Sequence, residues 1–251
     1  MGYLMLSVTV LGCSGSYASA TEACSGYLVS SGTTKVWVDC GPGTLAAIQQ
    51  HIDLGDVDAI VVTHQHPDHC GELPVLYNAL KWYIDLSGLP VYAPSGVREV
   101  TDVFVDDSSD VFEWTTIDAT SEVRVGDIDI RFDRTDHTVE TLACRFETGG
   151  NAVVYTADTG PGWDLSKLAA GVDVLIGDAT VVHADLSGGS PHLSARQLAE
   201  AADRASVGHL VLTHLAPGSD PERFLAEADR YFDGPVSCAS GGMVIRVGDG
   251  M

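Results

Sequence analysis

Side chains of the types that bind metal ions crowd residues 61–73, which read VVTHQHPDHCGEL. Three histidines and one aspartate fall within six positions, directly after an apolar run: His64, His66, Asp68 and His69. Imidazole nitrogens and carboxylates together suit Zn²⁺ and similar divalent ions, whereas structural zinc sites rely more on cysteine thiolates. One loop of six residues cannot saturate two metal ions, so further ligands must come from elsewhere in the chain.

Three further candidate ligands follow strand-like segments. His137 lies in RTDHTVE, Asp158 in YTADTGP and His214 in LTHLAP. Sheet-based folds place their sites in the loops at strand ends, so ligand-type residues recurring there indicate one shared site. Isolated histidines carry no such signal, and we interpret three as surface or satisfied core residues: His51, His183 and His209.

The elements that must position these residues follow from the apolar periodicity of the chain. Strands are expected over 4–12, 26–32, 35–41, 58–64, 90–94, 111–117, 122–133, 142–148, 152–158, 172–178, 209–214, 235–239 and 243–247. Helices are expected over 44–52, 71–86, 163–171, 194–205 and 221–232. Pro67 stops the strand before it, so the segment around it is expected to be a loop. Two runs of strands closed by helices indicate two sheets with helices on their outer faces, in one domain over residues 1–251.

Composition limits the classes of partner. Hydrophobic residues make up 45% and charged residues 19% of the 251 residues, which is typical of a soluble globular protein. Lys+Arg number 13 against 35 Asp+Glu, for a net charge of −22. A merely soluble or salt-adapted surface explains this charge most simply, and it disfavours binding of a long nucleic acid. Bound metals would still attract a small anionic substrate.

The apolar segments and the cysteines predict a cytoplasmic protein. We find no apolar run of membrane-spanning length and no charged region followed by a signal-peptide pattern, so no membrane association is expected. The six cysteines form no C-x-x-C pair, which is typical of reduced, structural thiols. Cys70, beside His69, is interpreted as a packing thiol rather than a nucleophile.

The run T-H-x-H-x-D-H-x-G, Thr63 to Gly71, resembles the signature of the metallo-β-lactamase superfamily. The resemblance covers nearly the whole chain, because V-D-C-G at 38–41, T-A-D-T-G at 156–160 and L-T-H at 212–214 fit in the same order. It implies an α/β fold, a four-layer αββα sandwich of two similar halves with a dinuclear metal site at one edge of the sheets.

The resemblance also implies a role for each candidate ligand. The first metal would be bound by His64, His66 and His137, the second by Asp68, His69 and His214, and Asp158 would bridge the two. The metals would be two divalent ions, with Zn²⁺ foremost and Mn²⁺ accepted by the same donors. Two cations would lower the pKa of a shared water and give hydroxide as nucleophile, which Asp68 would orient. Asp39 resembles the carboxylate that steadies a metal-bound histidine, and capping of the Gly-Pro-Gly turn is the alternative.

Two positions separate the branches of the superfamily. The zinc lactamases have a cysteine in place of the bridging aspartate and another residue in place of the last signature histidine. This chain has Asp158 and His69 there, which disfavours lactam hydrolysis. Diiron members carry a glutamate at the second signature position, where this chain has His66, so hydrolysis is favoured over redox chemistry.

Two further segments resemble elements of the tRNase Z-like phosphodiesterase branch. G-D-A-T at 177–180 and H-L-S-A-R-Q-L-A at 192–199 are similar to its H-E-A-T and H-S-T-A elements. The resemblance implies that His192, oriented by Asp178, assists departure of the leaving oxygen as a general acid. The branch usually has a glutamate at the position of Asp178, so the shorter side chain must still reach His192. A loop histidine before a helix beginning at Ser194 is the alternative for His192.

The substrate is expected to be a small phosphodiester such as a cyclic nucleotide. Only residues 138–157 separate His137 from Asp158, which leaves no room for the long arm of tRNA-processing members. The segments at 171–175, 192–194, 210–214 and 227–236 resemble compact actinobacterial-type members that are associated with cyclic-nucleotide phosphodiesterase activity. Hydrolysis of esters, thioesters or lactones is the alternative, and tRNA 3′-processing is less favoured than either. A scaffold protein without turnover is disfavoured because all seven ligand positions are filled.

Residues 81–118 leave their role open. This stretch contains an apolar helix end with Trp82 and Tyr83 and the acidic run VDDSSD. It is interpreted as a pocket wall or a dimer contact, and ordinary helix packing with a solvated loop is the alternative. A homodimer is therefore one expectation among others.

Overall fold

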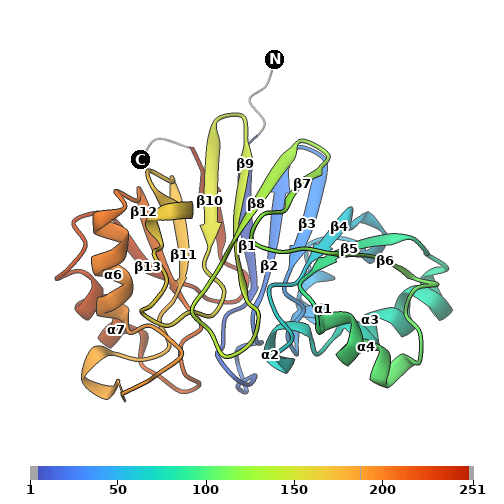
Figure 1. Cartoon of the computed structure of the whole chain (residues 1–251), viewed down its shortest axis with the longest axis horizontal. Helices are drawn as coiled ribbons and strands as arrows, with labels where there is room; N and C mark the ends of the chain where they lie inside the picture. The colour runs from blue at the N-terminus through green and yellow to red at the C-terminus, as the bar shows by residue number, and fades with distance from the viewer. Residues whose placement is uncertain (1–4, 187, 249–251) are drawn as a thin grey trace.

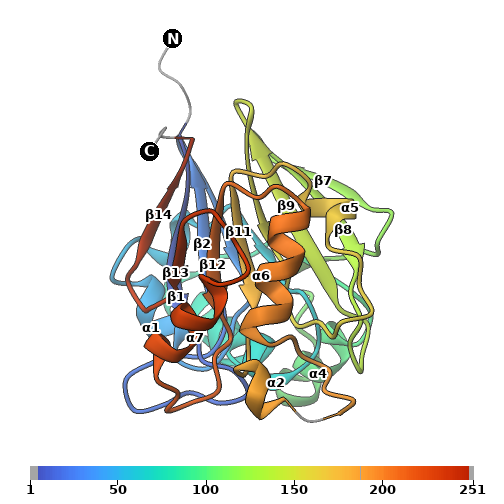
Figure 2. The same ribbon diagram turned by 90° about the vertical axis from the view of Figure 1, so that its left-hand side faces the viewer.

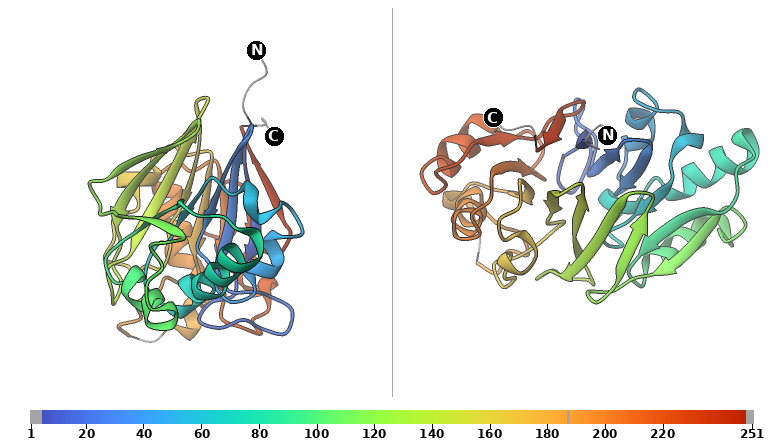
Figure 3. Two further views of the ribbon diagram at one scale, coloured as in Figure 1. Left: turned by 90° about the vertical axis from the view of Figure 1, so that its right-hand side faces the viewer. Right: turned by 90° about the horizontal axis from the view of Figure 1, so that it is seen from above.

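Two seven-stranded sheets face each other, and helices cover both outer faces (Figure 1). The computed structural model describes residues 5–186 and 188–248. Seen from above, the sheets form the inner layers and the helices the outer layers (Figure 3). The prediction of an αββα sandwich of two similar halves is confirmed, while the assignment of residues 1–251 to one domain stays a prediction.

The first sheet holds the first six strands, and the last strand of the chain returns to its edge. Its members, in spatial order, are β14 (Val244–Val247), β1 (Leu6–Gly12), β2 (Gly26–Ser31), β3 (Thr34–Val38), β4 (Ala59–Val61), β5 (Leu89–Ala93) and β6 (Phe112–Thr116). The strands from β3 to β6 pair in parallel.

The second sheet repeats this plan with the middle and late strands. Its members, in spatial order, are β13 (Val236–Cys238), β12 (His209–Thr213), β11 (Val174–Asp178), β10 (Asn151–Tyr155), β9 (Leu142–Thr148), β8 (Ile128–Arg134) and β7 (Glu122–Val125). The strands from β10 to β13 pair in parallel, so their carboxyl ends meet at one edge of the sheet.

The helices divide between the two outer faces. The first sheet is accompanied by α1 (Thr44–Ile48), η1 (Leu54–Asp56), α2 (Pro67–Cys70), α3 (Leu73–Ala79), the π-helical turn η2 (Leu80–Ile84) and α4 (Val97–Val105). The second sheet is accompanied by α5 (Ser166–Ala169), η3 (His183–Asp185), α6 (Ala195–Arg204) and α7 (Pro221–Ala228). Figure 2 shows α6 and α7 side by side over the second sheet.

The structure corrects several sequence-based boundaries. The helix expected over 71–86 consists of two elements, α3 and the π-helical turn η2 that follows it directly. Helices α1 and α5 are each shorter than expected. Pro67 begins the helical turn α2 rather than a loop. Proline is tolerated at the first position of a helix, because the N–H that it lacks would have no hydrogen-bond partner within the helix there. Helix α4 was not predicted, because its sequence VREVTDVFV is rich in β-branched residues that favour strands.

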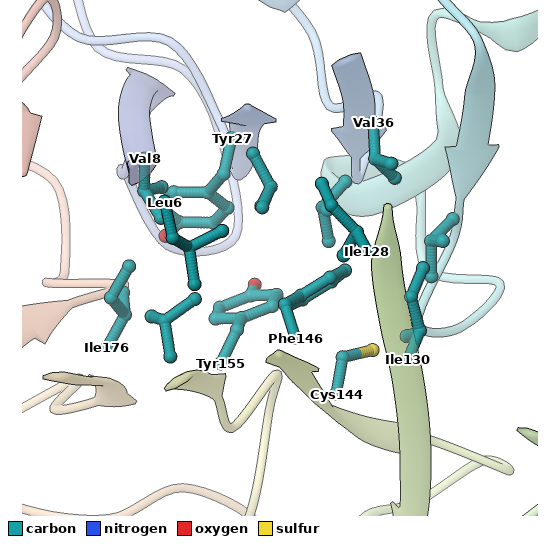
Figure 4. Packing of buried hydrophobic residues seen from close by; sticks show 14 of the residues in the cluster. Leu6, Val8, Tyr27, Val36, Ile128, Ile130, Cys144, Phe146, Tyr155 and Ile176 are labelled. Carbon is teal, nitrogen blue, oxygen red and sulfur yellow. The ribbon is translucent and has the colours of Figure 1, made fainter. Parts of the chain in front are cut away.

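Apolar side chains fill three interfaces, one between the sheets and one beneath each helical layer. The alternating residues of β8 show the inner interface most clearly, since Ile128, Ile130 and Phe132 are buried while Asp129 and Arg131 are exposed. Figure 4 shows Ile128 and Ile130 packed in this core with Tyr27 and Tyr155. The central parallel strand β11 is buried along its whole length because helices cover its other face.

Residues 81–118 place large apolar side chains on the surface. Trp82 and Tyr83 of η2 are 67% and 88% exposed, and Val103 and Phe104 of α4 are 79% and 77% exposed. A pocket wall or a dimer contact stays a prediction for this stretch.

A single carboxylate ties turns of both sheets together. Asp127, between β7 and β8, accepts hydrogen bonds from Ser31 Oγ at 2.7 Å, Thr34 Oγ1 at 2.5 Å and Thr148 Oγ1 at 3.2 Å. Burial by itself raises the pKa of Asp127, but the hydrogen bonds from the three hydroxyls outweigh it and lower the pKa. The ionised carboxylate is therefore the form that stabilises the fold.

Replacing Asp127 with asparagine is expected to lower the free energy of unfolding by about 1 kcal/mol at pH 7. Because the folded-state pKa is depressed, this contribution is present above the unfolded value of about 3.9 and is lost as pH falls through the folded value. Urea unfolding at pH 7 and below pH 4 measures the difference, with the exposed Asp233→Asn as control. An equal difference at both pH values would contradict the prediction.

Candidate metal centre

The segment after β4 brings four of the predicted ligands to one edge of the sandwich. The chain leaves β4 at Val61, and His64 follows at the base of the site, fully buried. The helical turn α2 then places Asp68 and His69 next to each other, both buried. The other predicted ligands arrive from the second half: His137 after β8, Asp158 after β10 and His214 directly after β12.

Four of these side chains form a first cluster of donor atoms. His66 Nδ1 lies 3.1 Å from His64 Nε2 and 3.2 Å from His137 Nε2. Asp158 Oδ2 lies 3.6 Å from His64 Nε2 and also 3.6 Å from His137 Nε2. The first predicted ligand set is therefore brought together around one point.

A second cluster uses the other oxygen of the same aspartate. His214 Nε2 lies 3.3 Å from both Asp68 Oδ2 and Asp158 Oδ1. His69 Nε2 lies 3.2 Å from Asp158 Oδ1 and 3.6 Å from Asp68 Oδ2. The two carboxylate oxygens of Asp158 thus face different clusters, which is the arrangement a bridging ligand needs.

The donor atoms of each cluster fit a metal ion. Four donors at about 2.0–2.1 Å from a tetrahedral Zn²⁺ are roughly 3.3–3.4 Å apart. Four of the six separations in each cluster run from 3.1 to 3.6 Å. All the donor atoms of a cluster lie within 4.8 Å of one another. In addition, His69 Nε2 and Asp158 Oδ1 are buried and lack a hydrogen-bond partner of good geometry. Buried polar atoms are rarely left in this state, and a cation between them would satisfy both.

Asp39 steadies the first half of the site from below. Its carboxylate accepts hydrogen bonds from His69 Nδ1 at 2.7 Å, from the Thr63 amide at 2.8 Å and from Tyr155 Oη at 3.1 Å. Of the two roles considered for Asp39, contact with a histidine predicted to bind metal is the one that its side chain makes in the structure. Because β10 carries Tyr155, this network also joins the second sheet to the first.

A second tyrosine makes the reciprocal link. The hydroxyl oxygen of Tyr27, on β2, lies 2.6 Å from Thr213 Oγ1, and Thr213 directly precedes His214. The rings of Tyr27 and Tyr155 pack with their centroids 4.6 Å apart (Figure 4). Neither tyrosine was predicted to serve the site, because an apolar strand pattern does not show which hydroxyls reach across to the other sheet.

Close backbone approaches complete the second cluster. A Cβ at Gly15 would lie 2.7 Å from the carbonyl oxygen of His214, so only glycine fits there. The next residue, Ser16, donates its amide to Asp68 Oδ2 at 2.8 Å. This contact was not predicted from the sequence, where the run Cys13-Ser14-Gly15-Ser16 indicates only a loop after the first strand.

Besides Ser16, with a φ angle of 62°, three residues of the site have left-handed backbone conformations. The φ angles are 57° at Asp39, 53° at Ala157 and 58° at His214. Such conformations cost residues other than glycine free energy and concentrate at functional sites. At His214 and Ala157 the chain turns sharply at the end of a strand, which aims the ligand side chains at the clusters.

Burial and neighbouring charges shift the pKa values of several groups in the site. Burial lowers the pKa of His64 and of His137. Burial also opposes protonation of His214, but Asp158 and Asp68 outweigh it and raise the pKa of His214 to about 9. Burial raises the pKa of Asp158, but His214 and His69 outweigh it and lower the pKa overall. The Asp158 carboxylate is thus held ionised, as a metal ligand must be.

His192 lies over the two clusters and contacts its predicted partner. Its Nδ1 lies 2.9 Å from Asp178 Oδ2, so the shorter aspartate side chain does reach it. The ring of His192 stacks on that of His214 with centroids 5.1 Å apart and planes at 24°. Ser194 caps α6 two residues later through the amide of Gln197, which fixes the chain at this point.

A pocket of about 250 Å³ opens beside His192. Its other lining residues come from the loop after β10, from the segment leading into α6 and from α6 itself: Pro161, Leu186, Gly188, Gly189, Ser190 and Gln197. Its volume is sufficient for a small organic group.

The three histidines and the cysteine that were not assigned to the site have other surroundings. His51 is exposed, His183 Nδ1 lies 3.0 Å from Ser194 Oγ and His209 Nε2 lies 2.9 Å from Ser237 Oγ. Burial raises the pKa of the Cys70 thiol to about 12, which makes it a poor nucleophile. Its interpretation as a packing thiol agrees with this geometry.

Residues 34–215 match the family model described as the beta-lactamase superfamily domain. The chain belongs to the beta-lactamase superfamily. Among its relatives, the probable metallo-hydrolase YhfI of Bacillus subtilis is 30% identical, over 95% of this chain and 99% of YhfI. The crystal structure of YhfI superimposes with a TM-score of 0.89 at 28% identity, over 96% of this chain and 99% of YhfI.

Two mycobacterial relatives are also similar over most of their length. An uncharacterized protein of Mycobacterium leprae is 34% identical, over 94% of this chain and 86% of its own. A ribonuclease Z of Mycobacterium bovis is 32% identical, over 92% of this chain and 95% of its own. This superfamily member is therefore a metallo-hydrolase, as predicted. In the described part of the chain, every helix is too short or too polar to span a bilayer.

Proposed function

We propose that this metallo-hydrolase is a phosphodiesterase that acts on small phosphodiesters such as cyclic nucleotides, with two divalent metal ions, Zn²⁺ foremost. The observation that carries the proposal is the Asp178–His192 pair beside the candidate metal clusters. Bound metals would supply Lewis acidity and activation of a water. His64, His66 and His137 would hold one ion, Asp68, His69 and His214 the other, and Asp158 both.

The side chains of the chain divide the remaining work. Asp68 is held by the Ser16 amide beside the second cluster, where its carboxylate would orient the attacking water. Because Asp178 occupies Nδ1 of His192, Nε2 remains to give a proton to the departing ester oxygen. An alkoxide leaving group needs that proton, so this pair suits phosphodiesters of sugars and other alcohols.

Several observations favour a small phosphodiester over a long nucleic acid. The ribonuclease Z relative carries the name of an enzyme that cuts RNA, whose backbone is a chain of phosphodiesters. Here, however, residues between His137 and Asp158 form only the hairpin of β9 and β10, without a protruding arm. The net charge of −22 also repels a polyanion. A small anion would instead meet the metals and the pocket beside His192.

Metal analysis followed by a substrate screen tests the proposal. We expect two equivalents of Zn²⁺ per chain, and turnover of cyclic nucleotides that a chelator abolishes and added Zn²⁺ restores. The screen includes bis-aryl phosphates, thioesters, lactones and a tRNA precursor. Cleavage of thioesters or lactones without cleavage of any phosphodiester would refute the proposal, as would turnover of cyclic nucleotides by the metal-stripped chain.

A further inference from the structure

Each half of the sandwich carries the same arrangement of an aspartate and a histidine. Asp39 follows β3 in the first half, Asp178 ends β11 in the second, and both side chains are fully buried. Each carboxylate binds the Nδ1 atom of one imidazole directly, with His69 at 2.7 Å from Asp39 Oδ2 and His192 at 2.9 Å from Asp178 Oδ2.

A threonine hydroxyl extends each arrangement to a second histidine. Thr63 Oγ1 lies 3.0 Å from Asp39 Oδ1 and 3.1 Å from His64 Nδ1. Thr180 Oγ1 lies 2.7 Å from Asp178 Oδ1 and 3.0 Å from His214 Nδ1. The amide of each threonine also donates to the same aspartate, at 2.8 Å for Thr63 and 3.1 Å for Thr180.

The proton count of a hydroxyl decides the direction of these contacts. A threonine hydroxyl has one proton and a carboxylate only accepts, so the proton is donated to the aspartate. The hydroxyl oxygen then accepts a hydrogen bond from the histidine, which requires a proton on Nδ1. The lone pair of each histidine is thereby left on Nε2, and the Nε2 atoms of His64 and His214 are the atoms that face Asp158.

We propose that Thr63 and Thr180 are positioning residues that fix His64 and His214 as Nε2 donors to metal, one in each cluster. Thr180 has a second consequence, because its hydroxyl joins the metal ligand His214 to the Asp178–His192 pair. The inference rests on the proposed metal centre. Thr63 contacts a residue of the first cluster and Thr180 a residue of the second, so the main effect of each hydroxyl is expected on the affinity of its own cluster.

The experiment is a Zn²⁺ titration of the full chain in competition with a chromophoric chelator. Thr180→Val keeps the shape of the side chain and removes the hydroxyl. It is expected to weaken one of two Zn²⁺ equivalents by about tenfold to 100-fold. Thr180→Ser restores the hydroxyl and is expected to restore the affinity. Thr63→Val weakens the other equivalent, and the double variant weakens both. Thr116→Val, at an exposed position of β6, is the matched control.

Melting temperatures in excess chelator separate a folding defect from a metal effect. Without metal, Thr180→Val is expected to melt a few degrees below Thr180→Ser, because it lacks the hydrogen bond to Asp178, and both variants are expected to unfold cooperatively. Thr180→Ala replaces the valine variant if the latter does not fold. Native Zn²⁺ affinity in the variant without the hydroxyl would overturn the inference and leave the metal centre standing. Equal loss in the serine variant would overturn it too. A native chain that binds no Zn²⁺ would overturn the metal centre and the inference together.

Discussion

Replacing His192 with alanine is expected to slow hydrolysis of cyclic nucleotides by about 10²- to 10⁴-fold, the usual contribution of a general acid. The ribose oxygen leaves as an alkoxide, and its departure requires the proton that His192 would give from Nε2. Bis(4-nitrophenyl) phosphate releases a stabilised phenolate that leaves without a proton, so its hydrolysis should change by less than about tenfold. The ratio of the two rates is the measurement, with kcat and KM determined for each substrate.

Two variants sharpen this test. Asp178→Asn keeps the size of the side chain but loses the charge that orients His192, so it should show the same preference for nitrophenyl leaving groups with a smaller loss. His51→Ala alters an exposed histidine away from the site and should leave both rates unchanged. An equal fall for both substrates in His192→Ala, with native metal content, would show that His192 does not act on the leaving group.

Replacing Asp158 with asparagine is expected to abolish tight binding of both metals and to lower kcat/KM by at least about 10³-fold. Asp158 is the residue whose two oxygens face both clusters, and each oxygen lies 3.2–3.6 Å from two histidine nitrogens. Asparagine offers one oxygen and an N–H group, so at most one cluster keeps its carbonyl-type donor and neither keeps the negative charge.

Thermal unfolding with and without Zn²⁺ reports the same loss independently of activity. A metal at 100 times its Kd adds about 2.7 kcal/mol to the native chain. For a chain of this size that corresponds to a rise in Tm of roughly 5–11 °C. Asp158→Asn should lose this rise, while Asp53→Asn, an exposed position, should keep it. Retention of both metals by the Asp158 variant would be incompatible with a bridging role.

The sequence by itself predicted the fold class and the residues that assemble at its edge. Apolar alternation and strand-end residues are local signals, and the motif around His64 places four ligand-type side chains within six positions. The strands that precede Asp158 and His214 were recognisable because buried parallel strands are continuous apolar runs. The pairing of Asp178 with His192 followed from the resemblance, and the structure places the two side chains in contact.

Helix α4 and the backbone of α2 were beyond these local signals. The β-branched residues of α4 favour a strand when taken alone, and only packing against α3 and the first sheet makes the helix the better solution. Pro67 is compatible with either a loop or the start of a helix, and only the structure shows that it begins the helical turn that contains the buried Asp68 and His69.

The hydrogen bonds that hold the predicted ligand side chains in place were decided by the tertiary structure alone. Tyr155 reaches Asp39 across the two sheets from 116 positions away, and Ser16 reaches Asp68 from 52 positions away. In the sequence, Thr63 and Thr180 are ordinary threonines near strand ends. Only the structure places each hydroxyl between an aspartate and a histidine. Residue types and spacing along a chain encode which side chains a strand end presents. The hydrogen bonds that fix their tautomers depend on how two sheets pack, which no local spacing records.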